Sequence, residues 1–370
     1  MAMIEQVTLR DFKSHASTTL SLHPLTLLVG PNGAGKTSVL QAIHLLGRLH
    51  HRSSEQLFQP PAAEGDLVRH ADGVDGFVLS AQGTHAGVTR ALSLEVSRDI
   101  AVAYDEYGNE EEHPSWSSLV RGRRGDDAWS VVYGPSLVAQ AWPAQWDDLR
   151  RTALMRLDAG QIARPSPAAA DAHMRADGAG AATVLANLQQ TQPAKVEAIT
   201  ARLREMVPQV KRVGAVPTKM DASVDGFQLV LDFVGGHSVA APGVSEGTLL
   251  LLALLMMLDK RQRPRTLLLD DLDAGLHPTA QGRLVDMLME LTRGPEAIQI
   301  VATTHSPYVL DRVSPEAVHV FALRPDGVTA VKCLSEHPEA ARYRGALSAG
   351  ELWTLDDEQT WVVAPTAGGA

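Results

Sequence analysis

The chain has 370 residues, 45% of them hydrophobic and 21% charged, the proportions of an ordinary globular protein with one large core or two moderate ones. The formal net charge of −10 argues against a sequence-independent grip on nucleic acid by the whole surface, while leaving room for a local basic groove. A single cysteine, Cys333, excludes a disulfide framework and a multi-cysteine zinc site within one chain, and the longest apolar run (residues 249–258) is too short to span a bilayer. We therefore expect a cytoplasmic protein that does not enter the membrane.

The N-terminal part of the chain predicts strands, a glycine-rich turn and one helix. "MIEQVTLRDF" and "STTLSL" alternate like the two strands of a hairpin, and "LTLLVG" is typical of a buried strand. A helix should begin near Gly35, because Val39, Ile43 and Leu46 then share one face. Residues 76–134 predict an antiparallel patch of four strands separated by turn residues: "GFVLSAQG", "ALSLEVSR", "IAVAYDEYG" and "WSVVYG".

From residue 142 to 208 the composition shifts to Ala, Leu, Gln and Arg, which predicts short helices such as "AATVLANLQQT" and "AKVEAITARLREM". Strands and helices then alternate up to "VTAVKCL", so we expect one α/β sheet interrupted by a helical insertion. We divide the chain into an N-terminal lobe (1–140), a helical insertion (141–215), a C-terminal lobe (216–335) and a tail (336–370). The tail ends in the small, polar "APTAGGA", for which we expect disorder.

Residues 30–38, "GPNGAGKTS", satisfy the G-x-x-x-x-G-K-[ST] pattern of a phosphate-binding loop. Glycines let successive backbone N–H groups converge on phosphate oxygens at the start of a helix, where the helix dipole also favours an anion. We predict an ATP site in which Lys36 reaches the β- and γ-phosphates and the Thr37 hydroxyl binds Mg²⁺. The loop residues predicted to bind nucleotide are Gly30, Asn32, Gly33, Ala34, Gly35, Lys36, Thr37 and Ser38.

The stretch "TLLLDDLDAGLHP", residues 266–278, predicts a buried strand that ends on two aspartates. Two adjacent carboxylates repel each other unless a cation lies between them. In phosphate-loop enzymes an acid at this strand end holds Mg²⁺, a role that fits Asp270. Asp271 is then placed to orient or deprotonate the attacking water. The alternative, that Asp271 only caps the following turn, stays open.

Two further stretches indicate which kind of phosphate-loop protein this is. "VSEGTLLLLALL" puts Ser245 and Gly247 just before an apolar helix, and "VATTHSPYVL" puts His305 at a strand end. With the two motifs above, in this order, they resemble the ABC-type ATPase head, closest to the structural-maintenance-of-chromosomes (SMC) and RecF branch and to single-chain ATPases related to overcoming-lysogenization-defect proteins. The resemblance covers residues 4–334. It implies an α/β P-loop fold with a mixed central sheet, an antiparallel β subdomain and a helical lobe.

The resemblance also implies roles for single residues. Ser245 and Gly247 match the signature motif, which completes the ATP site of the opposite subunit in a head-to-head homodimer. His305 matches the switch histidine at the γ-phosphate, and Asp273 through His277 match the loop that crosses the dimer interface. For a lone histidine after a strand, a structural role remains the alternative.

"RDFKSH" resembles the N-terminal nucleotide-contacting stretch of the chromosome-maintenance heads, which implies that Lys13 and Ser14 touch the nucleotide; a plain surface turn is the alternative. The glutamine that normally links nucleotide to the helical lobe in this family is not identifiable from a motif, and among the candidates Gln161 is preferred over Gln140 and Gln145.

The chain also departs from the family pattern. The family usually has Glu where this chain has Asp271, and a carboxylate drawn back by about one bond is compatible with slow turnover, since ~1 Å of misplacement can cost ~10²-fold. Asp273 is placed to compensate. The segment between the two halves is too short, and lacks the heptads, for long coiled-coil arms, and no nuclease domain fits after "VTAVKCL".

The main functional hypothesis is an ATPase that dimerises around two ATP molecules and controls a separate effector, a nuclease or a toxin, as in bacterial defence systems against phage. The alternative is a RecF-like, ATP-dependent clamp or scaffold on DNA in repair or maintenance. DNA as a ligand and assembly beyond the dimer are left open. The basic clusters at residues 121–124, 211–212 and 261–265 are candidate DNA contacts, each interpreted as a solvated surface turn. A transporter engine and an isolated kinase fit the motifs less well.

Overall fold

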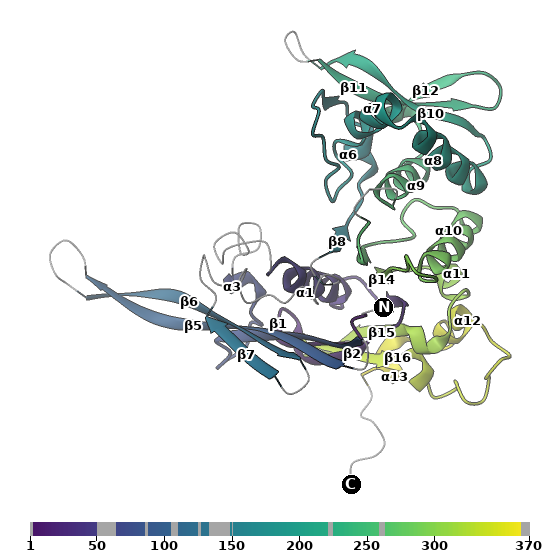
Figure 1. Ribbon diagram of the computed structural model, residues 1–370. Coiled ribbons are helices and arrows are strands. Elements are labelled where there is room, and N and C mark those ends of the chain that lie inside the picture. The colour runs from purple at the N-terminus through teal and green to yellow at the C-terminus, as the bar shows by residue number, and fades with distance from the viewer. Residues whose placement is uncertain are drawn as a thin grey trace. The chain divides into compact units, whose positions relative to one another are not determined.

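The computed structural model describes residues 3–49, 64–85, 88–104, 110–124, 127–132, 149, 151–220, 225–258 and 263–363 (Figure 1). The chain divides into two compact units. Unit 1 comprises Met1–Thr152, Arg265–Leu268 and Leu291–Ala370, and unit 2 comprises Ala153–Pro264 and Leu269–Glu290. Each unit therefore combines segments that lie far apart in the sequence.

One sheet of unit 1 is antiparallel, with the strand order β2-β1-β4-β5-β6-β7. The predicted N-terminal hairpin is confirmed, because β1 pairs with β2 from Gln6↔Ser21 to Phe12↔His15. Beyond residue 97, β5 pairs only with β6, so the two strands extend as a long ribbon (Figure 1). The strands are β1 (Gln6–Phe12), β2 (His15–Ser21), β4 (Gly76–His85), β5 (Val88–Tyr104), β6 (Glu110–Arg124) and β7 (Asp127–Val132).

The prediction for this sheet was wrong in two places. "ALSLEVSR" and "IAVAYDEYG" were expected as two strands, but most of both lies in the single strand β5, because no Gly, Pro or Asn interrupts the sequence between them. The strand β6 was not predicted, since its polar start "EEEHP" hides the strand pattern.

The second sheet of unit 1 is mixed and runs β16-β15-β3-β14-β13. Strand β3 is parallel to both β14 and β15, whereas β16 is antiparallel to β15. Every residue of β3 and β14 is buried, as expected for the centre of a sheet covered on both faces. Helix α1 contacts β14 of this sheet and β1, β4 and β5 of the antiparallel sheet. The strands are β3 (Leu25–Val29), β13 (Thr266–Leu269), β14 (Gln299–Thr303), β15 (Val318–Leu323) and β16 (Thr329–Cys333), and α1 spans Lys36–Arg48.

Unit 2 packs helices against a small antiparallel sheet. Helices α7 (Ala181–Thr191) and α8 (Pro193–Met206) confirm the two helices predicted there, and both contact β10 (Val210–Lys219). Strand β10 itself was not predicted, because Lys211, Arg212 and Pro217 obscure its alternation. The remaining elements of this unit are β9 (Ser166–Pro167), β11 (Asp225–Phe233), β12 (Ser238–Ala240), η2 (Ala241–Gly243), α6 (Ala159–Ala163), α9 (Glu246–Leu258) and α10 (Pro278–Leu291).

The segment after Glu336 contains more structure than the sequence suggested. Helix α12 (Ala349–Trp353) begins with a capping box between Ser348 and Glu351, and α13 (Glu358–Trp361) buries Trp361 against the ring of His337, with ring centres 4.8 Å apart. "APTAGGA", residues 364–370, lies outside the described residues. The four-part division of the chain stays a prediction. Further elements are α3 (Glu64–Leu67), β8 (Thr152–Met155), α11 (Pro307–Leu310), η3 (Pro315–Ala317) and η4 (Leu334–Glu336).

Among the residues that the structure describes, no helix has both the length and the apolar character needed to cross a membrane.

Candidate functional site

The predicted phosphate loop lies between β3 and α1 of unit 1. The strand is buried throughout and ends at Val29, and α1 begins at Lys36, so residues 30–35 form the turn that the motif predicts. A Cβ on Gly30 would come within 2.2 Å of the carbonyl oxygen of Phe321 in β15. The loop therefore approaches the neighbouring strand closely only because this position has no side chain.

The ammonium group of Lys36 lies inside the loop. Its Nζ donates hydrogen bonds to the carbonyl oxygens of Gly30 and Pro31, both at 2.8 Å, and the residue is buried. The positive charge thus lies beside the backbone N–H groups at the start of α1, where a helix dipole also favours an anion. This combination of groups suits a polyphosphate.

Two side chains from outside the motif contact carbonyl groups of the loop. His15, at the start of β2, places its Nε2 atom 3.1 Å from the carbonyl oxygen of Gly35. Thr329, at the start of β16, donates from its hydroxyl to the carbonyl oxygen of Ala34 at 3.0 Å. Sequence reasoning missed Thr329 entirely, because it lies almost 300 residues further along the chain.

The side chain of His15 is fully buried, and this burial lowers its pKa from the ordinary 6.5 to about 4, despite the opposing hydrogen bond to Gly35. The unfolded chain therefore binds a proton that the folded chain rejects as the pH falls from about 6.5 toward 4, so His15 lowers stability in that window.

We expect the free energy of unfolding of the native chain to fall between pH 7 and pH 4 by about 3 kcal/mol more than that of His15→Gln, which has no group titrating there. Urea unfolding of both proteins at several pH values measures this difference. Parallel pH curves for the two proteins would contradict it.

The stretch "RDFKSH" lies beside the phosphate loop. Lys13 has a left-handed backbone (φ 53°) and donates from Nζ to Oε1 of Gln41 in α1 at 2.6 Å, and partial burial lowers its pKa. Ser14 Oγ lies 2.7 Å from the hydroxyl of Thr329. Lys13 therefore contacts the helix that follows the loop, and Ser14 contacts a residue that is hydrogen-bonded to the loop. Their contact with nucleotide stays a prediction.

His305 follows the carboxyl end of β14, the strand that runs parallel to β3. The N–H group of Thr304 still donates to the carbonyl oxygen of Leu28 at 3.1 Å, so the parallel pairing continues to the residue before His305. The histidine is exposed at the same edge of the sheet from which the phosphate loop starts.

The acidic pair lies in unit 2. The side chain of Asp270 is buried, with an exposed fraction of 2%, and its Oδ2 atom lies 3.7 Å from Nε of the largely exposed Arg156. Asp271 is exposed and adopts a left-handed backbone conformation (φ 57°), and its carbonyl oxygen accepts from the N–H of Ala274. Adjacent residues thus have opposite environments, one carboxylate buried beside a cation and one exposed on a turn.

The signature residues lie at the start of α9. The carbonyl oxygen of Ser245 accepts from the N–H groups of Thr248 (3.1 Å) and Leu249 (3.2 Å), which leaves the exposed serine at the helix N-terminus. A Cβ on Gly247 would lie 2.4 Å from the carbonyl oxygen of Gly275, which belongs to the loop after the acidic pair. That same loop carries Asp273. The fold thus packs the predicted signature against the predicted interface loop, within unit 2.

Gln161, the preferred glutamine, lies in α6, where its N–H group donates to Oδ1 of Asp158. The other two glutamines considered, Gln140 and Gln145, lie outside the described residues.

Comparisons with known proteins identify the relatives of this chain. Residues 3–112 match a family model described as "AAA ATPase domain", and residues 166–311 match one described as "AAA domain, putative AbiEii toxin, Type IV TA system". The chain is 36% identical over 99 residues to the DNA replication and repair protein RecF of Erwinia tasmaniensis, and 37% identical over 97 residues to that of Salmonella paratyphi A. Two segments of the chain thus match ATPase family models, and a stretch of it is similar to RecF. Each match covers 26% of the chain and 24% of the relative, so the chain spans about a quarter of the length of the curated relatives it matches.

The fold of the chain is that of an SMC head. An SMC head bound to the C-winged helix domain of ScpA has a TM-score of 0.54, with 16% identity, over 89% of this chain and 96% of that one. An SMC head domain with an extended coiled coil, bound to the C-terminal domain of ScpA derived from Pyrococcus furiosus, has a TM-score of 0.52, with 14% identity, over 90% of this chain and 96% of that one. The mixed sheet and the antiparallel sheet expected for this fold are both present.

The groups predicted to hold Mg²⁺ suit that ion chemically. Thr37 offers a hydroxyl oxygen and Asp270 a buried carboxylate, and Mg²⁺ prefers oxygen ligands. Within the described residues no group of three or more His, Cys, Asp or Glu side chains is placed to hold a metal. Mg²⁺ in nucleotide sites usually takes one or two protein ligands and completes its shell with phosphates and water.

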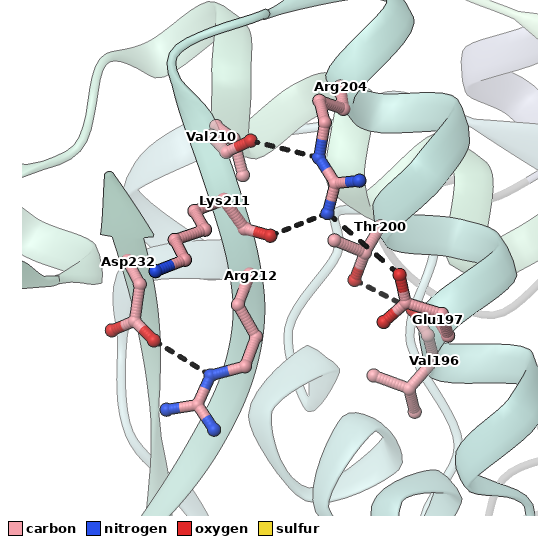
Figure 2. A network of polar contacts seen from close by, with 8 residues as sticks. All are labelled: Val196, Glu197, Thr200, Arg204, Val210, Lys211, Arg212 and Asp232. Carbon is pink, nitrogen blue, oxygen red and sulfur yellow. Dashed lines mark hydrogen bonds and ion pairs between the residues drawn. The ribbon is translucent and has the colours of Figure 1, made fainter. Parts of the chain in front are cut away.

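In the basic cluster at residues 211–212, the arginine has a carboxylate partner (Figure 2). Arg212 in β10 donates from Nε to Oδ2 of Asp232 in β11 at 2.7 Å, and the hydroxyl of Ser238 donates to the other carboxylate oxygen. The Ser238 hydroxyl, and then Arg212, hold the pKa of Asp232 below its ordinary value, and Lys211 adds to this. A surface turn was expected for this cluster, but it lies in the strand β10. The pairing of Arg212 with Asp232 still fits a solvated surface.

Proposed function

We propose that this protein is an ATPase that binds and hydrolyses ATP as a head-to-head dimer and controls a separate effector, a nuclease or a toxin, in the cytoplasm during bacterial defence against phage. The observation that carries the ATP site is the phosphate loop with Lys36 held inside it. The defence role is supported by the family model over residues 166–311, whose description names a toxin and a TA system.

In this proposal the loop residues bind the phosphates, and Thr37 and Asp270 hold Mg²⁺. A Mg²⁺ ion bound there would supply charge neutralisation for the γ-phosphate during transfer. Asp271 accepts a proton from the attacking water, and His305 contacts the γ-phosphate. Asp270 is a buried carboxylate, and a buried charge needs a cation nearby; Arg156 lies beside it in this structure.

Ser245, Gly247 and Asp273 are proposed to complete the ATP site of the partner subunit. Ser245 is exposed, and the N-terminus of α9 supplies N–H groups that favour an anionic γ-phosphate. The two ATP molecules then act as the contact between subunits, and hydrolysis separates them.

Replacing Ser245 with arginine should abolish ATP-dependent dimerisation and leave ATP binding by the monomer intact, because the long side chain blocks the approach of a second subunit while the phosphate loop is untouched. Light scattering gives the oligomeric mass and calorimetry gives the dissociation constant of ATP. Loss of both properties, or retention of the dimer, would argue against a composite site.

The second candidate function is a RecF-like, ATP-dependent DNA clamp or scaffold, which the similarity to RecF favours. Turnover of Mg²⁺-ATP with and without duplex DNA separates the two functions. Stimulation by DNA supports the clamp, whereas turnover that ignores DNA supports control of an effector protein.

A further inference from the structure

Two consecutive carbonyl groups of the phosphate loop are each held by a side chain from a distant part of unit 1. The carbonyl oxygen of Ala34 accepts from the hydroxyl of Thr329 at 3.0 Å, and that of Gly35 lies 3.1 Å from Nε2 of His15. Neither side chain belongs to the phosphate-loop motif. Both are buried, so neither contact competes with bulk water.

The geometry of the peptide bond gives these contacts a consequence for nucleotide binding. In a trans peptide the C=O and N–H groups point in opposite directions in one plane. The carbonyl of Ala34 shares its plane with the N–H of Gly35, and the carbonyl of Gly35 shares its plane with the N–H of Lys36. A side chain that holds each carbonyl on one side of the loop therefore directs the following N–H toward the other side.

We propose that His15 and Thr329 are positioning residues of the nucleotide site, which hold these two peptides so that the N–H groups of Gly35 and Lys36 face the phosphates of ATP. The inference rests on the proposed ATP-binding role of the loop. It adds that the loop is held in its binding conformation before ATP arrives, so that less ordering accompanies binding.

The hydrogen bonds of His15 fix its tautomer. A carbonyl oxygen only accepts, so the proton must lie on Nε2, and Nδ1 then accepts from the hydroxyl of Thr18 at 2.9 Å. Burial lowers the pKa of His15 and so favours the neutral ring. A neutral ring has one N–H donor, which the contact with Gly35 needs, and one acceptor nitrogen, which the contact with Thr18 needs.

The bare Cα of Gly35 allows both side chains to reach the loop. Gly35 has φ +99°, and a Cβ there would lie 2.6 Å from Oγ1 of Thr329 and 2.8 Å from Nε2 of His15. Thr329 is itself fixed, because its N–H group donates to the carbonyl oxygen of Ser14 at 2.8 Å. The side chains of His15 and Thr329 therefore both pack against Gly35 and leave no room for a Cβ there.

Paired substitutions at each position test the proposal. Thr329→Ser keeps the hydroxyl, whereas Thr329→Val keeps the shape and removes it. His15→Gln keeps a donor at the place of Nε2, whereas His15→Asn reaches only the place of Nδ1. We expect the valine and asparagine variants to raise the dissociation constant of Mg²⁺-ATP roughly tenfold, and the serine and glutamine variants to stay within about threefold of the native chain.

Thr200→Val is the matched control. It removes a buried hydrogen bond of the same kind, from the Thr200 hydroxyl to the carbonyl oxygen of Val196 at 2.7 Å, in α8 of unit 2 (Figure 2). It should lower the melting temperature of the protein without nucleotide and leave the dissociation constant unchanged. Calorimetry and thermal melting of every variant separate a loss of stability from a loss of binding.

The inference is wrong if Thr329→Val and His15→Asn bind Mg²⁺-ATP as the native chain does, or no more weakly than Thr200→Val. Lys36→Ala distinguishes this failure from failure of the proposed function. If the native chain binds ATP and Lys36→Ala does not, the proposed ATP site stands, and only the positioning role of His15 and Thr329 is contradicted. If the native chain and Lys36→Ala both fail to bind, the proposed function falls, and the inference falls with it.

Discussion

Lys36→Ala should reduce ATP hydrolysis by at least about a hundredfold, because it removes a charge-assisted contact to the β- and γ-phosphates that strengthens as charge develops in the transition state. The same change also removes the two hydrogen bonds from Nζ to the carbonyl oxygens of Gly30 and Pro31. The loop then loses its internal cation, so we expect weaker ATP binding as well as slower turnover. Phosphate release and calorimetry measure the two effects.

Lys219→Ala provides the control for the change in charge. Lys219 is an exposed lysine of β10 that pairs with Asp225 at 2.7 Å, and exposed pairs of this kind contribute about 1 kcal/mol or less. Its removal should leave binding and turnover unchanged. Equal activities of Lys36→Ala and the native chain would show that the loop does not hold the reacting phosphates.

Asp271→Asn should lower turnover by about 10²- to 10⁴-fold, the usual range for loss of a general base, while ATP binding and the ATP-bound dimer persist. The left-handed backbone of Asp271 (φ 57°) matters for this test, because Asn tolerates that conformation about as well as Asp does. The variant therefore removes the negative charge without disturbing the turn. Hydrolysis rates and oligomeric mass with Mg²⁺-ATP check both parts.

The same backbone conformation suggests why the chain carries the shorter acid. A residue without a short polar side chain is destabilised by about 1 to 2 kcal/mol in this region, so Asp271→Glu should lower the free energy of unfolding by about 1 kcal/mol relative to Asp271→Asn.

For the turnover test of Asp271→Asn, the exposed Asp225 of β11 provides the control, because Asp225→Asn also removes one carboxylate. If Asp271→Asn turns over like the native chain, Asp271 only caps its turn. If the native chain and Asp271→Asn both fail to hydrolyse ATP but both dimerise when ATP is bound, the protein is a scaffold held together by ATP.

Local patterns were sufficient to predict most of the elements that carry the site. The buried strand β3, the glycine turn and α1 were predicted because apolar runs, glycine and helical periodicity act over a few residues. The strands with mixed composition were not: β6 and β10 contain charges and proline, and only pairing with β5 and β11 makes them strands. The helix α12 was missed although its capping box, Ser348 to Glu351, is visible in the sequence.

The sequence by itself was enough to predict a phosphate loop, an acidic pair, a signature and a switch histidine, because each prediction depends on a short run of neighbouring residues. Only the tertiary structure decided what surrounds them. It brought His15 and Thr329 onto the loop, placed Arg156 beside Asp270, and put Gly275 against Gly247. Sheet pairing and close packing join residues that lie from a few tens to 300 positions apart, and no local pattern along the chain records such contacts.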